Sequence, residues 1–207
     1  MKYLLVVFLV CALVSCEDNP AQKTKSSQTV INDSNIIKKE AANPYSQVDV
    51  STMDMVYFPA DFPVKKMNGE AKGQPVMRVI YSRPHRGGRK LFGGLVKWGQ
   101  PWRLGANEAT EIEFFQPVTI QNKKVPVGKY IMYAIPYEDH WTIVLNSNLY
   151  TWGLKFNPED DVLKFDVATA PQPRLVEHFT ISFEPTYNGA HLIMAWENTE
   201  ARMPFQF

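Results

Sequence analysis

The sequence predicts an all-β fold, an antiparallel β-sandwich of jelly-roll-like type with about nine to eleven short strands. Apolar and polar side chains alternate in four segments, 141–145, 163–167, 179–184 and 191–196. A period of two residues is typical of strands that bury one face. The chain also contains 15 prolines, spread along its length. Since proline interrupts helices, long helices are not expected.

Turn signals separate the predicted strands. Asn188-Gly189 lies between two alternating segments and predicts a two-residue hairpin. Glu138-Asp139 and Asn122–Lys124 indicate two further turns. Large aromatic side chains are frequent on the apolar faces, and they suit the space between two packed sheets. We therefore expect a sandwich in preference to a barrel.

The N-terminus predicts export. Met1 and Lys2 precede an almost unbroken apolar run, Tyr3–Val14. This run is shorter than the roughly 20 residues of a membrane-spanning helix and is typical of a signal peptide. It ends in Leu13-Val14-Ser15-Cys16, which resembles the lipobox of bacterial lipoproteins. The resemblance implies a signal peptide over residues 1–15 and a lipid, with palmitate-type acyl chains, on Cys16.

A polar stretch follows Cys16 and predicts a flexible tether. Residues 16–47 are rich in Ser, Asn, Lys and Gln and carry too little apolar surface to form a core. Residues 48–207 are then expected to form a single β-sandwich domain. Two or more acyl chains hold a protein stably on a membrane. The predicted location is the bacterial outer membrane, and both the periplasmic and the surface-facing orientation stay open.

Composition excludes several classes of function. The formal net charge of +1 gives no electrostatic reason to expect nucleic acid as a partner. Cys11 is predicted to leave with the signal peptide and Cys16 to carry lipid, so the mature domain has no thiol for a disulfide, a metal or a nucleophile. The four histidines show no metal-binding spacing, and we predict neither metal nor cofactor. One arrangement would place His178 and His191 facing each other across the predicted hairpin; surface or edge positions are the favoured alternative.

The segment 81–110 differs from the rest of the chain. It contains few alternating residues, and its length of about thirty residues exceeds that of ordinary connections, which makes it a candidate for function. Phe92, Trp98 and Trp102 argue against disorder. We therefore expect a long loop that packs against the domain.

Candidate binding residues gather in this loop. Trp102, Arg103, Asn107 and Glu108 combine an aromatic ring with a guanidinium, an amide and a carboxylate, a set that suits sugar, peptide or carboxylate ligands. The alternative is structural, with Arg103 paired to Glu108 or Glu111 as a clamp. Both interpretations stay open.

A basic run precedes that group. Arg83 and Arg89 flank Gly87-Gly88, just after Tyr81. Arginine forks and exposed backbone amides suit an anion such as phosphate or carboxylate. A solvated turn is the alternative.

Several motifs of the chain match one known pattern. They are Tyr81–Pro84, Gly88–Lys90 followed by Phe92-Gly93, Trp102–Thr110, Val125-Pro126, Gly128–Tyr130, Trp141-Thr142, Trp152-Gly153 and Trp196-Glu197. In these motifs the chain resembles a family of Gram-negative lipoproteins known as domain of unknown function (DUF) 2911. The chain departs from the family pattern in a longer lead-in, Met53–Pro75, and in His85-Arg86 after the Tyr81–Pro84 motif.

The resemblance implies no reaction. Members of the family are sometimes mislabelled asparagine synthetase B, and this chain does not support that activity. It lacks an N-terminal nucleophilic cysteine, because Cys16 is predicted to carry lipid, and it has no Ser-Gly-Gly loop for pyrophosphate.

Three functional hypotheses follow. The first is a lipid-anchored, non-enzymatic β-sandwich that binds a small molecule, a glycan or a protein of the envelope. Its predicted surface consists of Tyr81, Arg83, Arg89, Trp102, Arg103, Asn107 and Glu108. The second is a hydrolase of envelope polymers that uses Glu108 and Glu111 as acid and base. The third is a purely structural envelope protein.

Overall fold

The computed structural model of the protein describes residues 49–207. The predicted signal peptide, the lipidated Cys16 and the tether lie outside these residues and stay predictions, as does the domain boundary at residue 48. Within residues 49–207, no helix has the length and apolar character needed to cross a membrane.

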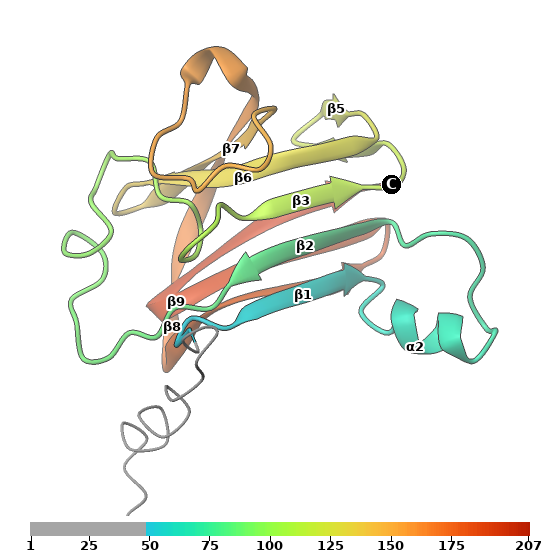
Figure 1. The fold of residues 1–207 in the computed structure, drawn as a ribbon, viewed down its shortest axis with the longest axis horizontal. Helices are drawn as coiled ribbons and strands as arrows, with labels where there is room; N and C mark the ends of the chain where they lie inside the picture. The colour runs from blue at the N-terminus through green and yellow to red at the C-terminus, as the bar shows by residue number, and fades with distance from the viewer. Residues whose placement is uncertain (1–48) are drawn as a thin grey trace, which may run out of the picture.

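Nine strands form one antiparallel sheet, which confirms the all-β prediction (Figure 1). The strands are β1 (Met53–Phe58), β2 (Met77–Ser82), β3 (Glu111–Phe114), β4 (Val118–Ile120), β5 (Lys123–Val125), β6 (Gly128–Pro136), β7 (His140–Asn146), β8 (Asp161–Thr186) and β9 (Gly189–Gln206). Their order in the sheet is β1-β2-β3-β6-β7-β8-β9-β4-β5. The helices of residues 49–207 are short: α2 (Phe62–Met67) and a 3-10 turn, η1 (Pro158–Asp160).

The strands β8 and β9 are much longer than the sequence predicts. The alternating segments 163–167 and 179–184 both belong to β8, whose 26 residues pair with β7 in the first part and with β9 in the second. The pairing of β8 with β9 shifts register on both sides of Val176, opposite Glu197, which has a positive φ of 56°. Such bulges bend a strand, so one long ribbon replaces several short strands.

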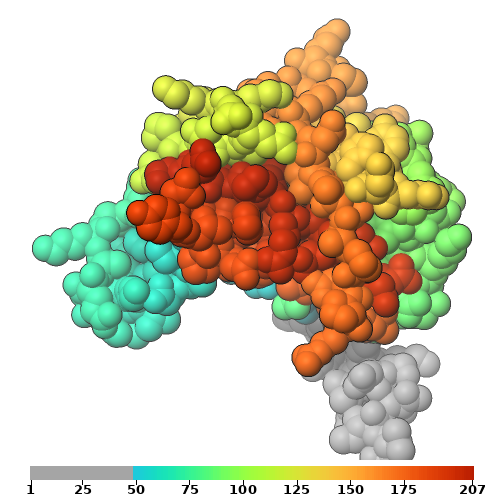
Figure 2. Space-filling view, turned by 180° about the vertical axis from the view of Figure 1, so that it is seen from behind, coloured from blue at the N-terminus to red at the C-terminus, as the bar shows by residue number. Residues whose placement is uncertain are grey.

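The bent ribbon folds back on itself. Gly189, at the start of β9, lies so close to the end of the same strand that a Cβ atom there would be 1.8 Å from the carbonyl oxygen of Phe205. From behind, β8 and β9, coloured orange to red, cover the middle of the molecule (Figure 2). The strand order is continuous through β8. The finer prediction, a jelly-roll-like sandwich of two sheets, therefore stays a prediction.

The hydrophobic core lies between the ribbon of β8 and β9 and other strands of the sheet, such as β7. Its large aromatic members include Trp141 on β7, Phe165 and Phe179 on β8, and Trp196 on β9, each at most 1% exposed. All four belong to the alternating segments of the sequence, so the predicted buried faces are confirmed.

The predicted turns exist, with small corrections. The β8–β9 hairpin turns at Tyr187-Asn188, one residue before the predicted pair, because Thr186 already pairs with Gly189. The β4–β5 turn consists of Gln121-Asn122, both with positive φ. Positive φ at both central residues matches the twist of a tight hairpin.

Candidate functional site

The long connection between β2 and β3 is packed, as predicted. Leu91 and Leu104 are fully buried and Phe92 is 7% exposed. The loop lies beside the end of the sheet that is opposite to α2 (Figure 1). Trp102 pairs with Ala134 of β6 through both backbone groups, with N···O distances of 2.7 and 2.8 Å. This ladder-like pairing fixes the loop on the sheet.

Trp102 is the exposed member of an aromatic cluster. Its ring stacks on Trp196 at a centroid distance of 5.8 Å and an interplanar angle of 16°. Trp141 and Phe179 contact it edge-on at 5.5 and 5.0 Å. Because Trp102 is only half-buried, one part of the cluster faces an open cleft.

The cleft has a volume of about 650 Å³. Three of the predicted binding residues line it: Arg89, Trp102 and Arg103. The other walls come from elsewhere in the chain, including Val50 before β1, Leu154 after β7 and Trp196 on β9. Within the described part of the chain, neither Asp nor Glu is among its lining residues.

Arg103 is held in place by carbonyl oxygens. Its Nη1 donates to the backbone oxygen of Trp152 at 2.9 Å and to that of Asn107. Its guanidinium carbon lies 5.8 Å from the centre of the Trp152 ring. Burial lowers the pKa of Arg103, and the negative charge of Glu108 partly opposes this effect. The predicted ion pair with Glu108 or Glu111 is absent from the described part of the chain, where backbone carbonyls take its place.

Gly153 makes this arrangement possible. Its φ is +76°, and a Cβ atom at this position would lie 2.9 Å from Cβ of Arg103 and 2.8 Å from Cβ of Ala109. Only glycine has both the backbone freedom and the small size that this contact requires. The Trp152-Gly153 motif therefore serves to seat the loop after β7 against Arg103.

Arg89 also lines the cleft. Its Nε donates to the carbonyl oxygen of Arg86 at 2.8 Å, and Nη2 donates to that of His85. Neither Arg89 nor Arg103 has a carboxylate partner among residues 49–207. Four other arginines do have one: Arg78 with Glu113, Arg83 with Asp54, Arg86 with Glu197, and Arg202 with Glu184 and Glu200. The two arginines of the cleft thus lack the acidic partners that these four possess.

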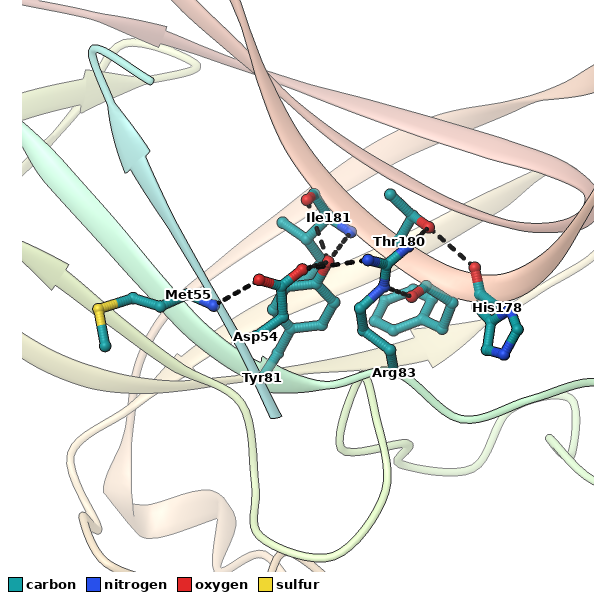
Figure 3. Close-up of polar contacts among 8 residues, drawn as sticks. Asp54, Met55, Tyr81, Arg83, His178, Thr180 and Ile181 are labelled. Carbon is teal, nitrogen blue, oxygen red and sulfur yellow. Dashed lines mark hydrogen bonds and ion pairs between the residues drawn. The ribbon is translucent and has the colours of Figure 1, made fainter. Parts of the chain in front are cut away.

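Tyr81 and Arg83, also predicted to bind, lie away from the cleft and join strands together (Figure 3). The Tyr81 hydroxyl accepts from the backbone N–H of Ile181 at 2.9 Å and lies 3.2 Å from a carboxylate oxygen of Asp54. Arg83 donates to the Thr180 hydroxyl at 3.1 Å and contacts Asp54 at 3.4 Å. Both residues therefore tie β2 to β1 and β8.

The buried Tyr81 makes the stability of the fold fall at alkaline pH. Burial raises its pKa from 10.0 to about 12. The folded state then keeps a proton that the unfolded state releases, so stability is lost as the pH rises from about 10 to about 12. We expect Tyr81→Phe to lower the free energy of unfolding by about 1–3 kcal/mol at neutral pH, because the Ile181 N–H loses its acceptor. Its stability should also fall less steeply between pH 10 and 12 in urea titrations.

Tyr187→Phe is the matched control, since Tyr187 is fully exposed in the β8–β9 turn. Its alkaline branch should coincide with that of the wild type. Burial and a hydrogen bond to Asp161 also raise the pKa of Tyr133, so Tyr81→Phe keeps part of the alkaline loss. An unchanged slope in Tyr81→Phe would contradict the role assigned to Tyr81.

Asn107 and Glu108 lie at different places. Asn107 adopts a positive φ of 60°, and its side-chain amide donates to the carboxylate of Asp49; neither residue is among the described residues that line the cleft. Glu108 instead lines a second hollow of about 320 Å³, together with Glu111. The Glu111 carboxylate is paired with Lys129 at 3.5 Å. The two carboxylates of the hydrolase hypothesis thus share a hollow outside the cleft, and one of them already has a cationic partner.

The sequence did not indicate the neighbours of His85. This residue lines the cleft, and its Nε2 lies 3.0 Å from a carboxylate oxygen of Glu177. Its ring contacts His178 at a centroid distance of 4.8 Å. The arrangement with His178 facing His191 is wrong, because the bend in β8 turns His178 toward His85 and His191 lies beside Glu184 at 3.7 Å. The one signal in the sequence that could have pointed to His85 was the departure of His85-Arg86 from the family pattern.

Across the described chain, His, Cys, Asp and Glu side chains form no group of three or more that is suited to a metal ion. Searches against curated proteins and against solved structures gave no match. A family model does match, over residues 63–205, and its description is "Protein of unknown function (DUF2911)". The match covers the sheet from β2 to β9 and every residue that lines the cleft except Val50 and Ser51. The chain therefore belongs to the DUF2911 family of proteins of unknown function.

Proposed function

We propose that this chain is a lipid-anchored envelope protein whose β domain binds a small anionic ligand in the cleft beside Trp102. The ligand would carry a carboxylate or phosphate group and an apolar part. The observation that carries the proposal is the charge of the cleft: it contains Arg89 and Arg103, and among residues 49–207 neither Asp nor Glu lines it.

The state of Arg103 supports an anionic ligand. A guanidinium has five N–H donors, and carbonyl oxygens engage only Nη1 of Arg103 within the described chain. Burial disfavours its charge, as the lowered pKa shows. An anion beside it would offset this cost and satisfy the remaining donors, and arginine forks bind carboxylate and phosphate in two-point contacts.

The proposed anchor rests on the N-terminal sequence. The lipobox-like tetrapeptide ends at Cys16, where the apolar run of the signal also ends. A lipid at this position would hold the domain at the bacterial outer membrane, on its periplasmic or its outer face. The ligand would then be a small molecule of the envelope, and the membrane is the partner of the lipid.

Binding of phenyl phosphate and benzoate tests the cleft. We expect the chain produced without residues 1–16 to bind one or both in isothermal titration calorimetry. Arg103→Gln should weaken this binding by about tenfold or more, because a hydrogen bond between charged groups contributes about 1.5–3 kcal/mol. Arg89→Gln should weaken it as well, and provides a second variant if Arg103→Gln is poorly folded.

Arg174→Gln is the matched control. Arg174 is exposed on β8, lies outside the cleft and also has no carboxylate partner among residues 49–207. It should bind both anions with the affinity of the wild type. If the wild type binds neither anion, or if all three variants bind equally well, the cleft is not an anion site and the purely structural hypothesis gains.

A further inference from the structure

Three aliphatic side chains of the cleft are exposed to solvent. Leu154 is 73% exposed, Val50 57% and Leu95 52%, and all three line the cleft. They come from three different segments: the chain before β1, the loop between β2 and β3, and the loop after β7. Covering aliphatic groups of a concave site with a ligand removes apolar surface from water, and this favours binding.

We infer that the ligand is an amphiphilic anion with a phosphate or carboxylate head and a single alkyl chain. This inference rests on the proposed function and specifies its ligand class. The head lies against Arg103 and Arg89, and the chain covers Leu95, Leu154 and Val50. The charge of the cleft and its exposed aliphatic walls are thereby matched by one molecule.

The aromatic cluster explains why the cleft suits an alkyl chain better than an aromatic ring of a ligand. Trp102 already stacks on Trp196, and Trp141 and Phe179 contact it edge-on. One face of its ring is thus already stacked, whereas the aliphatic walls are unpartnered over residues 49–207. A volume of about 650 Å³ lies within the usual range of about 300–1,000 Å³ for small-molecule sites.

A series of alkyl phosphates tests the inference. The chain produced without residues 1–16 is titrated with inorganic phosphate, butyl phosphate and octyl phosphate, each below its aggregation concentration. We expect the affinity to rise at least tenfold from butyl to octyl phosphate, since each buried methylene adds favourable transfer free energy. Octyl glucoside, which has the same chain and no charge, should bind far more weakly.

Substitutions in the aliphatic wall of the cleft distinguish the contribution of the ligand's alkyl chain to affinity from that of its phosphate head. Leu154→Asn and Leu95→Asn should lose most of the gain from butyl to octyl phosphate and keep the affinity for butyl phosphate. Val162→Asn is the control, because Val162 is 44% exposed on β8 and does not line the cleft. It should retain the full gain.

The outcomes distinguish this inference from the proposed function. Arg103-dependent binding of butyl phosphate without any gain from chain length would overturn the inference and leave the anion site in place. Absence of binding by every phosphate would overturn both. Co-sedimentation of the protein with phosphatidylglycerol vesicles, lost in Leu154→Asn and unaccompanied by binding of monomeric octyl phosphate, would also overturn it, because the aliphatic walls would then contact a bilayer surface.

Discussion

Trp196→Ala is expected to lower the free energy of unfolding by about 3–5 kcal/mol, the usual cost of removing a large buried aromatic side chain. Trp196 is 1% exposed and contacts Trp102 and Phe179. Its Nε1 also donates to the carbonyl oxygen of Glu177 at 3.2 Å. Chemical denaturation of the chain without residues 1–16 measures the change.

The same substitution should weaken ligand binding, because Trp196 supports Trp102 at the floor of the cleft. Trp196→Phe keeps the aromatic packing and removes the hydrogen bond to Glu177. Its loss of unfolding free energy should therefore be smaller than that of Trp196→Ala by roughly 2 kcal/mol or more. Tyr187→Ala is the control: Tyr187 is an exposed aromatic of the same hairpin, and its loss should stay within about 0.5 kcal/mol. A loss below about 1 kcal/mol in Trp196→Ala would contradict its place in the core.

Cys16→Ala is expected to abolish attachment of the full-length protein to membranes. Without Cys16 no lipid can be added, and a polar chain without acyl groups has no strong affinity for a bilayer. Detergent phase partitioning and mass spectrometry of the intact protein measure attachment and the mass of the lipid. The wild type should enter the detergent phase and carry the extra mass of acyl chains.

Cys11→Ala is the matched control within the same segment. Cys11 lies inside the apolar run, which is predicted to leave with the signal peptide. Its replacement should therefore leave attachment and lipid mass unchanged. Detergent partitioning of Cys16→Ala with the acyl mass still present would refute lipidation at this residue.

Local pattern accounts for most of the correct predictions about the fold. Alternation identified the buried residues of β7, β8 and β9, since strand geometry alone places every second side chain on one face. The length of β8 was not predictable, because the bulges near Val176 arise from pairing with residues about 20 positions away. The hairpin turn lies one residue before the predicted pair because Gly189 already pairs with Thr186 as the first residue of β9.

The candidate site shows the same division. The sequence singled out Arg89, Trp102 and Arg103 by residue type, and the structure brings them to one cleft. It could not separate them from Tyr81 and Arg83, which stand in the same run but point toward β1 and β8 (Figure 3). Side chains of an irregular loop do not alternate between two faces as those of a strand do. Their long-range partners alone therefore decide where each side chain lies.

By itself, the sequence determined the all-β class, the buried faces of the strands, the packed loop and the family, and it supplied the prediction of an anchor at Cys16. These properties depend on local periodicity, on composition and on motifs of neighbouring residues. The tertiary structure alone decided that Val50, Leu95 and Leu154 line one cleft with two arginines that have no carboxylate partner among residues 49–207. Leu95 is 45 positions after Val50 and 59 positions before Leu154, and only the folding of the sheet brings the three together.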